Sequence, residues 1–104
     1  MAGYAVAATG VLILVIMSIG ANRKFRDRAR LPMHWSFDRK VNWSAPRHLA
    51  LAFTPLLAAV VMALIANQLA SDPPLQFWTL TVVAAVFVAV HLLHLYLLEK
   101  WPAI

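Results

Sequence analysis

The chain has 104 residues, of which 62% are hydrophobic, and its mean hydropathy is +0.75. This composition is too apolar for a water-soluble fold of this length and indicates one integral membrane domain, residues 1–104. The absence of cysteine excludes disulfides, thiolate metal sites and a cysteine nucleophile. The formal net charge is +5, and eight of the nine Lys and Arg residues fall between Arg23 and Arg47. Such a local cluster indicates membrane topology and lipid contact, so nucleic acid is not an expected partner.

The first apolar segment, residues 4–21, carries no charge over eighteen positions. At about 1.5 Å per residue, a helix of this length nearly crosses a hydrocarbon core of about 30 Å. The first basic residues follow the apolar run, whereas a signal peptide carries them before it. We therefore expect a first transmembrane helix that stays in the mature protein.

A basic segment, residues 22–30, comes next and has two interpretations. Asp27 is its only acid, and its five basic residues are Arg23, Lys24, Arg26, Arg28 and Arg30. These side chains could bind anionic lipid headgroups or a partner protein. They could equally be the ordinary positive charge that keeps a short loop in the cytoplasm.

A polar and aromatic stretch, residues 31–47, separates the first two apolar segments. It cannot span a bilayer, and it is too aromatic for a simple hydrophilic linker. We expect the loop 22–48 to lie flat at the cytoplasmic interface, anchored by its tryptophan rings and by His34. The residues that define the stretch are Leu31, Pro32, His34, Trp35, Asp38 and Trp43.

This pattern resembles the small membrane domain of unknown function found at the N-terminus of SdpI-type immunity proteins. The loop of that family reads Leu-Pro, then His-Trp or His-Phe, then an Asn/Asp-Gly turn. The resemblance covers residues 31–57, and residues 37–39 (Phe-Asp-Arg) stand where the family places its glycine turn. It implies an immunity or signal-relay role in which the loop recognises a toxin or a cytoplasmic regulator.

Two more apolar segments, residues 49–69 and 77–98, predict the second and third transmembrane helices. Pro55 predicts a kink in the second helix, because proline removes a backbone donor. A short turn over residues 71–76 contains a proline pair and no Lys or Arg, so it belongs on the side opposite the basic loop. The N-terminus is then periplasmic and the C-terminus cytoplasmic.

Small residues recur at four-residue spacing within each predicted helix. Such steps let helix backbones approach closely, either within the chain or against partner helices. The pairs are Gly3 with Ala7, Ala59 with Ala63, and Ala85 with Ala89.

The histidines are the candidate metal ligands. His91 and His94 are three residues apart, so they share a helix face and could bind one metal together with His34 or His48. The other interpretation is that these histidines hydrogen-bond to neighbouring helices, loop carbonyls or a partner subunit. No serine, histidine and acid arrangement indicates catalysis, and no cofactor is expected.

The sequence thus predicts an all-α membrane protein with three transmembrane helices and an interfacial Trp-rich loop between the first two. Three short helices have little interior, so much of their surface faces lipid or protein. The leading hypothesis is a small non-catalytic accessory or scaffold subunit of a larger bacterial inner-membrane complex, or a homo-oligomer, in contact with membrane lipids. The alternatives are an SdpI-like immunity or signal-relay protein and a histidine-based metal-binding membrane protein.

Overall fold

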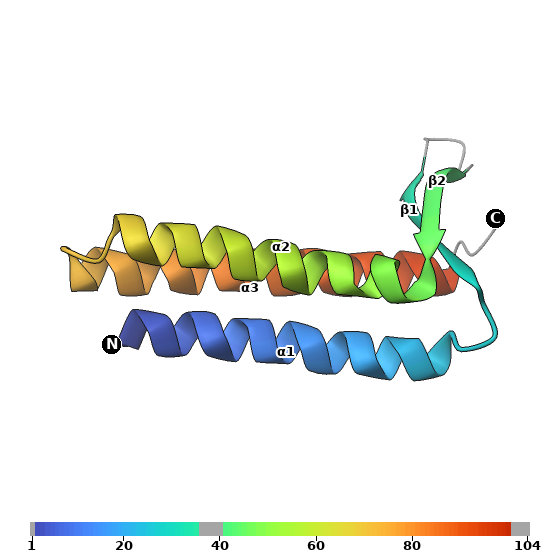
Figure 1. Cartoon of the computed structure of the whole chain (residues 1–104), viewed down its shortest axis with the longest axis horizontal. Helices are drawn as coiled ribbons and strands as arrows, with labels where there is room; N and C mark the ends of the chain where they lie inside the picture. The colour runs from blue at the N-terminus through green and yellow to red at the C-terminus, as the bar shows by residue number, and fades with distance from the viewer. Residues whose placement is uncertain (1, 36–40, 101–104) are drawn as a thin grey trace.

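The computed structural model describes residues 2–35 and 41–100. Three helices lie side by side: α1 (Ala2–Lys24), α2 (Arg47–Gln68) and α3 (Pro73–Lys100) (Figure 1). A two-stranded antiparallel hairpin, β1 (Arg30–Trp35) and β2 (Val41–Pro46), joins α1 to α2. All three helices are long and apolar enough to cross a membrane. The predicted all-α, three-span, multi-pass membrane fold is confirmed.

Each helix extends beyond its predicted span at one end or at both, most clearly at the start of α3. Pro73 and Pro74 were expected in the connection before this helix, but they are its first two residues. Proline is tolerated there because the first backbone N–H groups of a helix have no partner within the helix. Asp72 precedes the pair, and its Oδ1 accepts from the backbone N–H of Leu75 at 3.3 Å. Asp72 therefore caps the N-terminus of α3, and the proline pair occupies the first two positions of that helix.

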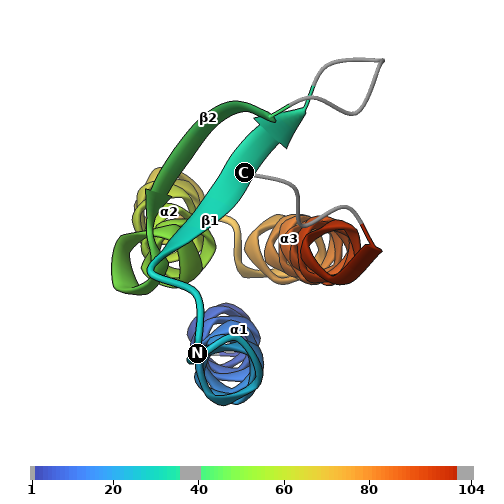
Figure 2. The same cartoon turned by 90° about the vertical axis from the view of Figure 1, so that its right-hand side faces the viewer.

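The connection between α1 and α2 is a hairpin where the sequence predicted only a loop. Leu31 pairs with Ala45 and His34 with Trp43, and the register shifts between Pro32 and His34. Apolar residues alternate with others along both strands, which is the pattern of a strand with one buried face. The hairpin runs across the helix axes and lies over the ends of α2 and α3 (Figures 1 and 2).

The core consists of two apolar clusters, one above the other along the bundle. The first fills the middle of the three helices and contains Leu14, Ala58, Met62, Ala66, Leu80 and Ala84. The second lies at the hairpin end and contains Ala21, Phe25, Leu31, Ala50, Leu51 and Leu98. Leu31 thus holds the hairpin against the helices from a fully buried position.

The close contacts between helices differ in part from those predicted from small-residue spacing. Ala58 and Ala84 face the core, one position before the predicted Ala59 and Ala85. Ala63 and Ala89 are exposed. Gly3 does make a close contact, because a Cβ built on it would lie 2.6 Å from Oε1 of buried Gln76. The pairs on α2 and α3 therefore face outward.

Gly10 is a buried glycine of α1 that packs against the core, and it provides a test of the packing. A Cβ there would lie 3.0 Å from the Cβ of Ala84 and 3.6 Å from Cε of Met62. We expect Gly10→Val to lower the free energy of unfolding in detergent by about 1–3 kcal/mol, as overpacked cores do. Gly20→Val is the matched control on the same helix, since no neighbouring atom of the described residues lies within 4 Å of a Cβ at Gly20. Equal losses for the two variants, measured by thermal melting followed by circular dichroism, would contradict this packing.

Candidate functional site

A buried polar junction separates the two apolar clusters. It consists of the Ser18 hydroxyl on α1, the Leu51 carbonyl on α2 and the His91 imidazole on α3. Ser18 and His91 are 9% and 0% exposed. Each of the three helices contributes one polar group to this Ser18 junction, so the junction joins the whole bundle.

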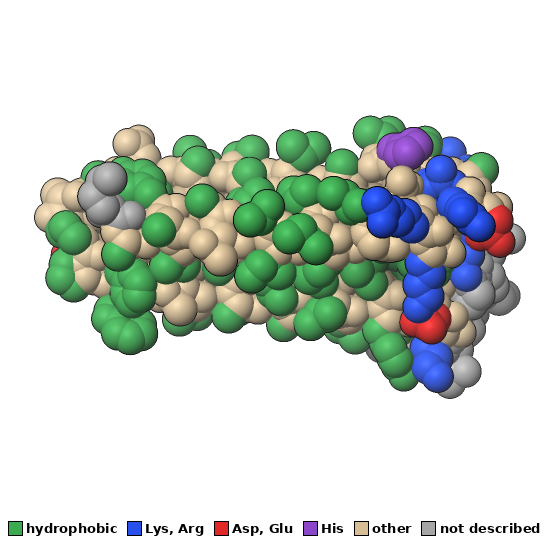
Figure 3. Space-filling view, turned by 90° about the horizontal axis from the view of Figure 1, so that it is seen from below, with side chains coloured by type: hydrophobic (Ala, Val, Ile, Leu, Met, Phe, Trp, Pro, Cys, Tyr) green, Lys and Arg blue, Asp and Glu red, His purple; other side chains and the backbone are tan. Residues whose placement is uncertain are grey.

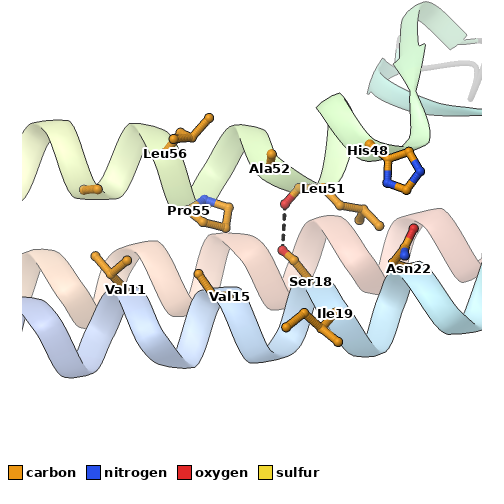
Figure 4. A pocket seen from close by; sticks show the side chains of 11 residues that line it. Val11, Val15, Ser18, Ile19, Asn22, His48, Leu51, Ala52, Pro55 and Leu56 are labelled. Carbon is orange, nitrogen blue, oxygen red and sulfur yellow. Dashed lines mark hydrogen bonds between the residues drawn. The ribbon is translucent and has the colours of Figure 1, made fainter.

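The junction begins with a carbonyl that Pro55 leaves without its helical donor. In an α-helix the N–H of residue 55 would donate to the carbonyl of residue 51, but proline has no N–H. The Ser18 hydroxyl donates to this Leu51 oxygen at 2.7 Å (Figure 4). A neighbouring helix thereby supplies the hydrogen bond that α2 lost, as membrane interiors require of a helix containing proline.

The same serine sets the tautomer of His91. Its oxygen lies 2.9 Å from His91 Nε2. The single hydroxyl hydrogen goes to Leu51, so the Ser18 oxygen must accept and Nε2 must carry the hydrogen. Nδ1 then has the free lone pair, and this atom is buried without a hydrogen-bond partner in the described part of the chain.

Ser18 also lines an open groove between α1 and α2, which we call the Ser18 groove. The groove has a volume of about 430 Å³, and two of its polar side chains besides Ser18, those of Asn22 and His48, lie at the hairpin end (Figure 4). The remainder is apolar and is lined by Val11, Val15, Ile19, Leu51, Ala52, Pro55, Leu56 and Ala59. This shape suits an amphiphile whose polar end lies beside the hairpin.

Arg47 holds the hairpin end of the bundle together. Its Nε donates to Asn22 Oδ1 at 2.8 Å, and its Nη1 donates to the carbonyls of Arg26 at 2.6 Å and Arg28 at 2.9 Å. A third carbonyl, that of Phe25, lies 3.4 Å from the same nitrogen. Arg47, the first residue of α2, therefore donates hydrogen bonds to carbonyls just beyond the end of α1. Carbonyls at the C-terminal end of a helix have no backbone N–H partner within that helix.

Two further basic side chains have partners within the chain. Lys24 forms an ion pair with Glu99 at 2.8 Å. Arg28 donates to the Leu98 carbonyl at 2.9 Å, and its guanidinium carbon lies 4.5 Å from the centre of the Phe25 ring. Figure 3 shows the basic side chains gathered at one end of a face that is otherwise largely hydrophobic.

The predicted basic patch is thus divided between internal contacts and exposed charge. Lys24 and Arg28 tie α1 and its following turn to α3, whereas Arg23 and Arg26 are exposed. Arg30 is also exposed at the start of β1, but it already has an interaction partner. Arg23 and Arg26 are the members of the patch best placed to meet an anion outside the chain.

The structure describes the loop motif only in part. Leu31 is fully buried, and Pro32, His34, Trp35 and Trp43 lie on the two paired strands. The side chains of these four residues, and Asp38 altogether, lie outside the described residues. The predicted interfacial anchoring by the tryptophans stays a prediction.

The histidines occupy different environments. His91 lies within the bundle, His94 is half-buried one turn later, and His48 is exposed at the start of α2. Among the described residues, no three His, Cys, Asp or Glu side chains come together to hold a metal ion. The hydrogen bond between His91 and Ser18 agrees with the interpretation of His91 as a residue that joins helices.

Sequence reasoning missed Ser18 and Arg47. Pro55 was a usable signal, because its missing donor requires a partner for Leu51, but the sequence does not say which helix supplies that partner. Arg47 gave no comparable signal, since its role depends on how the hairpin returns the chain to the end of α1.

Comparison of the chain with protein-family models, with curated proteins and with solved structures found no match.

A double-mutant cycle tests the link between Pro55 and Ser18. Ser18→Ala leaves the Leu51 carbonyl and the His91 N–H without a partner, so we expect a loss of about 1–2 kcal/mol in the free energy of unfolding. In a Pro55→Ala background the new N–H of residue 55 donates to Leu51, and Ser18→Ala should then cost less. The cycle should give an interaction free energy of about 0.5–1 kcal/mol.

Reversible unfolding in mixed detergent measures all four proteins of the cycle. Strictly additive losses would mean that Ser18 does not replace the hydrogen bond that Pro55 removes.

Proposed function

We propose that this chain is a small, non-catalytic accessory or scaffold subunit that docks against a larger bacterial inner-membrane assembly. The observation that carries the proposal is that Ala59, Ala63, Ala85 and Ala89 lie on open grooves at the outside of the bundle. Small residues at a helix surface are used in membranes where another helix approaches closely. In this bundle the alanine faces are open, so a partner helix can approach them closely.

Two of these grooves flank α1. One, between α1 and α2, has a volume of about 610 Å³ and includes Tyr4, Ala59 and Ala63. The other, between α1 and α3, has a volume of about 570 Å³ and includes Ala85 and Ala89. A partner helix seated in the α1–α2 groove would bury Leu12, which is now 58% exposed, and one seated in the α1–α3 groove would bury Leu92, which is 57% exposed.

The basic end of the bundle supports an orientation for this docking. The described basic residues of the α1–α2 connection lie at the end that also contains the hairpin, whereas the α2–α3 turn at the other end has no Lys or Arg. By the positive-inside rule the hairpin end and the C-terminus are cytoplasmic and the N-terminus is periplasmic. The hairpin then offers a second contact surface on the cytoplasmic side.

An immunity or signal-relay role is the second candidate. It is favoured by the hairpin itself, because the described residues that resemble the start of the SdpI-type loop, Leu31, Pro32, His34, Trp35 and Trp43, lie on two paired strands across the bundle end. In this account the hairpin, not the alanine grooves, contacts the toxin or regulator.

Affinity purification from native membranes, with mass spectrometry of the captured proteins, tests the leading proposal. We expect one membrane complex to co-purify with the wild-type chain, and Ala59→Leu with Ala63→Leu to lower its recovery at least about tenfold, which corresponds to about 1.4 kcal/mol of binding free energy. The matched control is Val60→Leu, at an exposed position beside Ala59 on the same helix.

Two results would contradict the accessory-subunit proposal: a wild-type chain that purifies alone in mild detergent, or a complex that survives the double alanine substitution unchanged. A complex lost only when the hairpin motif is changed would favour the second candidate.

A further inference from the structure

We propose that the Ser18 groove is a binding site for one anionic phospholipid, with an acyl chain along the groove and the phosphodiester held by Arg23 and Arg26. The site does not depend on a protein partner. It lies in the leaflet at the hairpin end of the bundle, where the groove has its polar mouth.

The length of the groove fits an acyl chain in one leaflet. On α1 its lining runs from Val11 to Asn22, which are eleven helical steps apart. At about 1.5 Å per residue this is about 16 Å, close to half of a hydrocarbon core of about 30 Å. A chain that enters at Asn22 therefore ends near the middle of the bilayer.

The floor of the groove is well suited to an apolar chain because its polar atoms are already paired. The Ser18 hydroxyl and the Leu51 carbonyl bond to each other, and His91 bonds to Ser18 from the far side. Pro55 presents a ring and no N–H to the groove. An acyl chain can cover Ser18, Leu51 and Pro55 without separating the Ser18 hydroxyl or the Leu51 carbonyl from its hydrogen-bond partner, which would be costly in lipid.

The mouth of the groove has the charge that an anionic headgroup requires. Asn22 and His48 line it, and Arg47 is bonded to Asn22. Arg26 is placed at the same point because its carbonyl accepts from Arg47, and exposed Arg23 follows Asn22 directly. A guanidinium binds a phosphate oxygen through paired N–H donors. Two of them favour a headgroup with net negative charge over a zwitterionic one, because they repel the ammonium group of the zwitterionic headgroup.

The continuation of the groove between the same two helices offers an internal contrast. This second half is lined from Tyr4 to Val15 on α1 and from Ala59 to Asn67 on α2, and the described residues that line it are uncharged. It can accept an acyl chain, but it gives no reason to prefer an anionic headgroup. Comparison of the two halves therefore separates the effect of groove shape on lipid binding from the effect of the charge at the groove mouth.

The test uses the full chain reconstituted in phosphatidylcholine vesicles with trace spin-labelled phosphatidylglycerol or spin-labelled phosphatidylcholine. Electron paramagnetic resonance gives the relative association of each lipid with the protein. We expect phosphatidylglycerol to be preferred by the wild type and the preference to fall about fivefold in Arg26→Gln, as for the loss of about 1 kcal/mol per arginine near a membrane surface. Lys100→Gln removes one exposed charge from the same end of the bundle and should change the preference little.

A second pair of variants tests the acyl-chain part of the site. Ala52→Leu fills the Ser18 groove and should abolish most of the preference, whereas Ala63→Leu fills the other half and should leave it unchanged. Circular dichroism and elution volume confirm that each variant is folded. Since Ala63 belongs to the proposed protein-docking groove and Ala52 does not, loss of the partner and loss of the lipid are distinguishable.

Three results would overturn the lipid site. An equal effect of Lys100→Gln and Arg26→Gln would mean diffuse attraction to the basic end. An unchanged preference in Ala52→Leu would mean that no chain occupies the groove. A change of oligomeric state in Ala52→Leu with the preference intact would identify the occupant as a helix of a second copy.

Discussion

A carbonyl that Pro55 leaves without its helical donor is the constraint on which the arrangement of the three helices depends. In water the Leu51 oxygen would find a solvent partner, but within a bilayer it must find one in the protein. Ser18 supplies it, and His91 then donates to Ser18. The proline therefore makes α2 depend on α1 and α3 at this level of the membrane.

This dependence also explains why the core is divided. Ser18 lies between Leu14 and Ala21 on α1, and His91 lies between Ala84 and Leu98 on α3, so the polar groups are stacked between two apolar clusters. Apolar contacts alone position helices weakly in lipid, because lipid tails offer similar contacts. The directional hydrogen bonds of Ser18, between the two clusters, fix the rotation of each helix, and Arg47 fixes the hairpin end in the same way.

The sequence predicted the features that composition and charge determine: three apolar spans, the gathering of basic residues in the first connection, and little interior. It missed features that depend on how the chain returns on itself. The hairpin has few β-branched residues and contains Pro32, so only the alternation of Leu31 and Met33, and of Trp43 and Ala45, signalled strands. The predicted small-residue pairs on α2 and α3 begin one position after the alanines that face the core, Ala58 and Ala84. Alanine spacing alone does not show which face of a helix its neighbours cover.

The central claim is that the Leu51 carbonyl is hydrogen-bonded by Ser18. Infrared spectroscopy of the reconstituted protein with a ¹³C=¹⁸O label at Leu51 tests it most directly, because the amide I frequency of a single carbonyl falls when that carbonyl accepts a hydrogen bond. The account predicts a low, hydrogen-bonded frequency in the wild type and a shift to higher frequency in Ser18→Ala. A frequency typical of an unbonded carbonyl in the wild type, or no shift on removal of the hydroxyl, would contradict it.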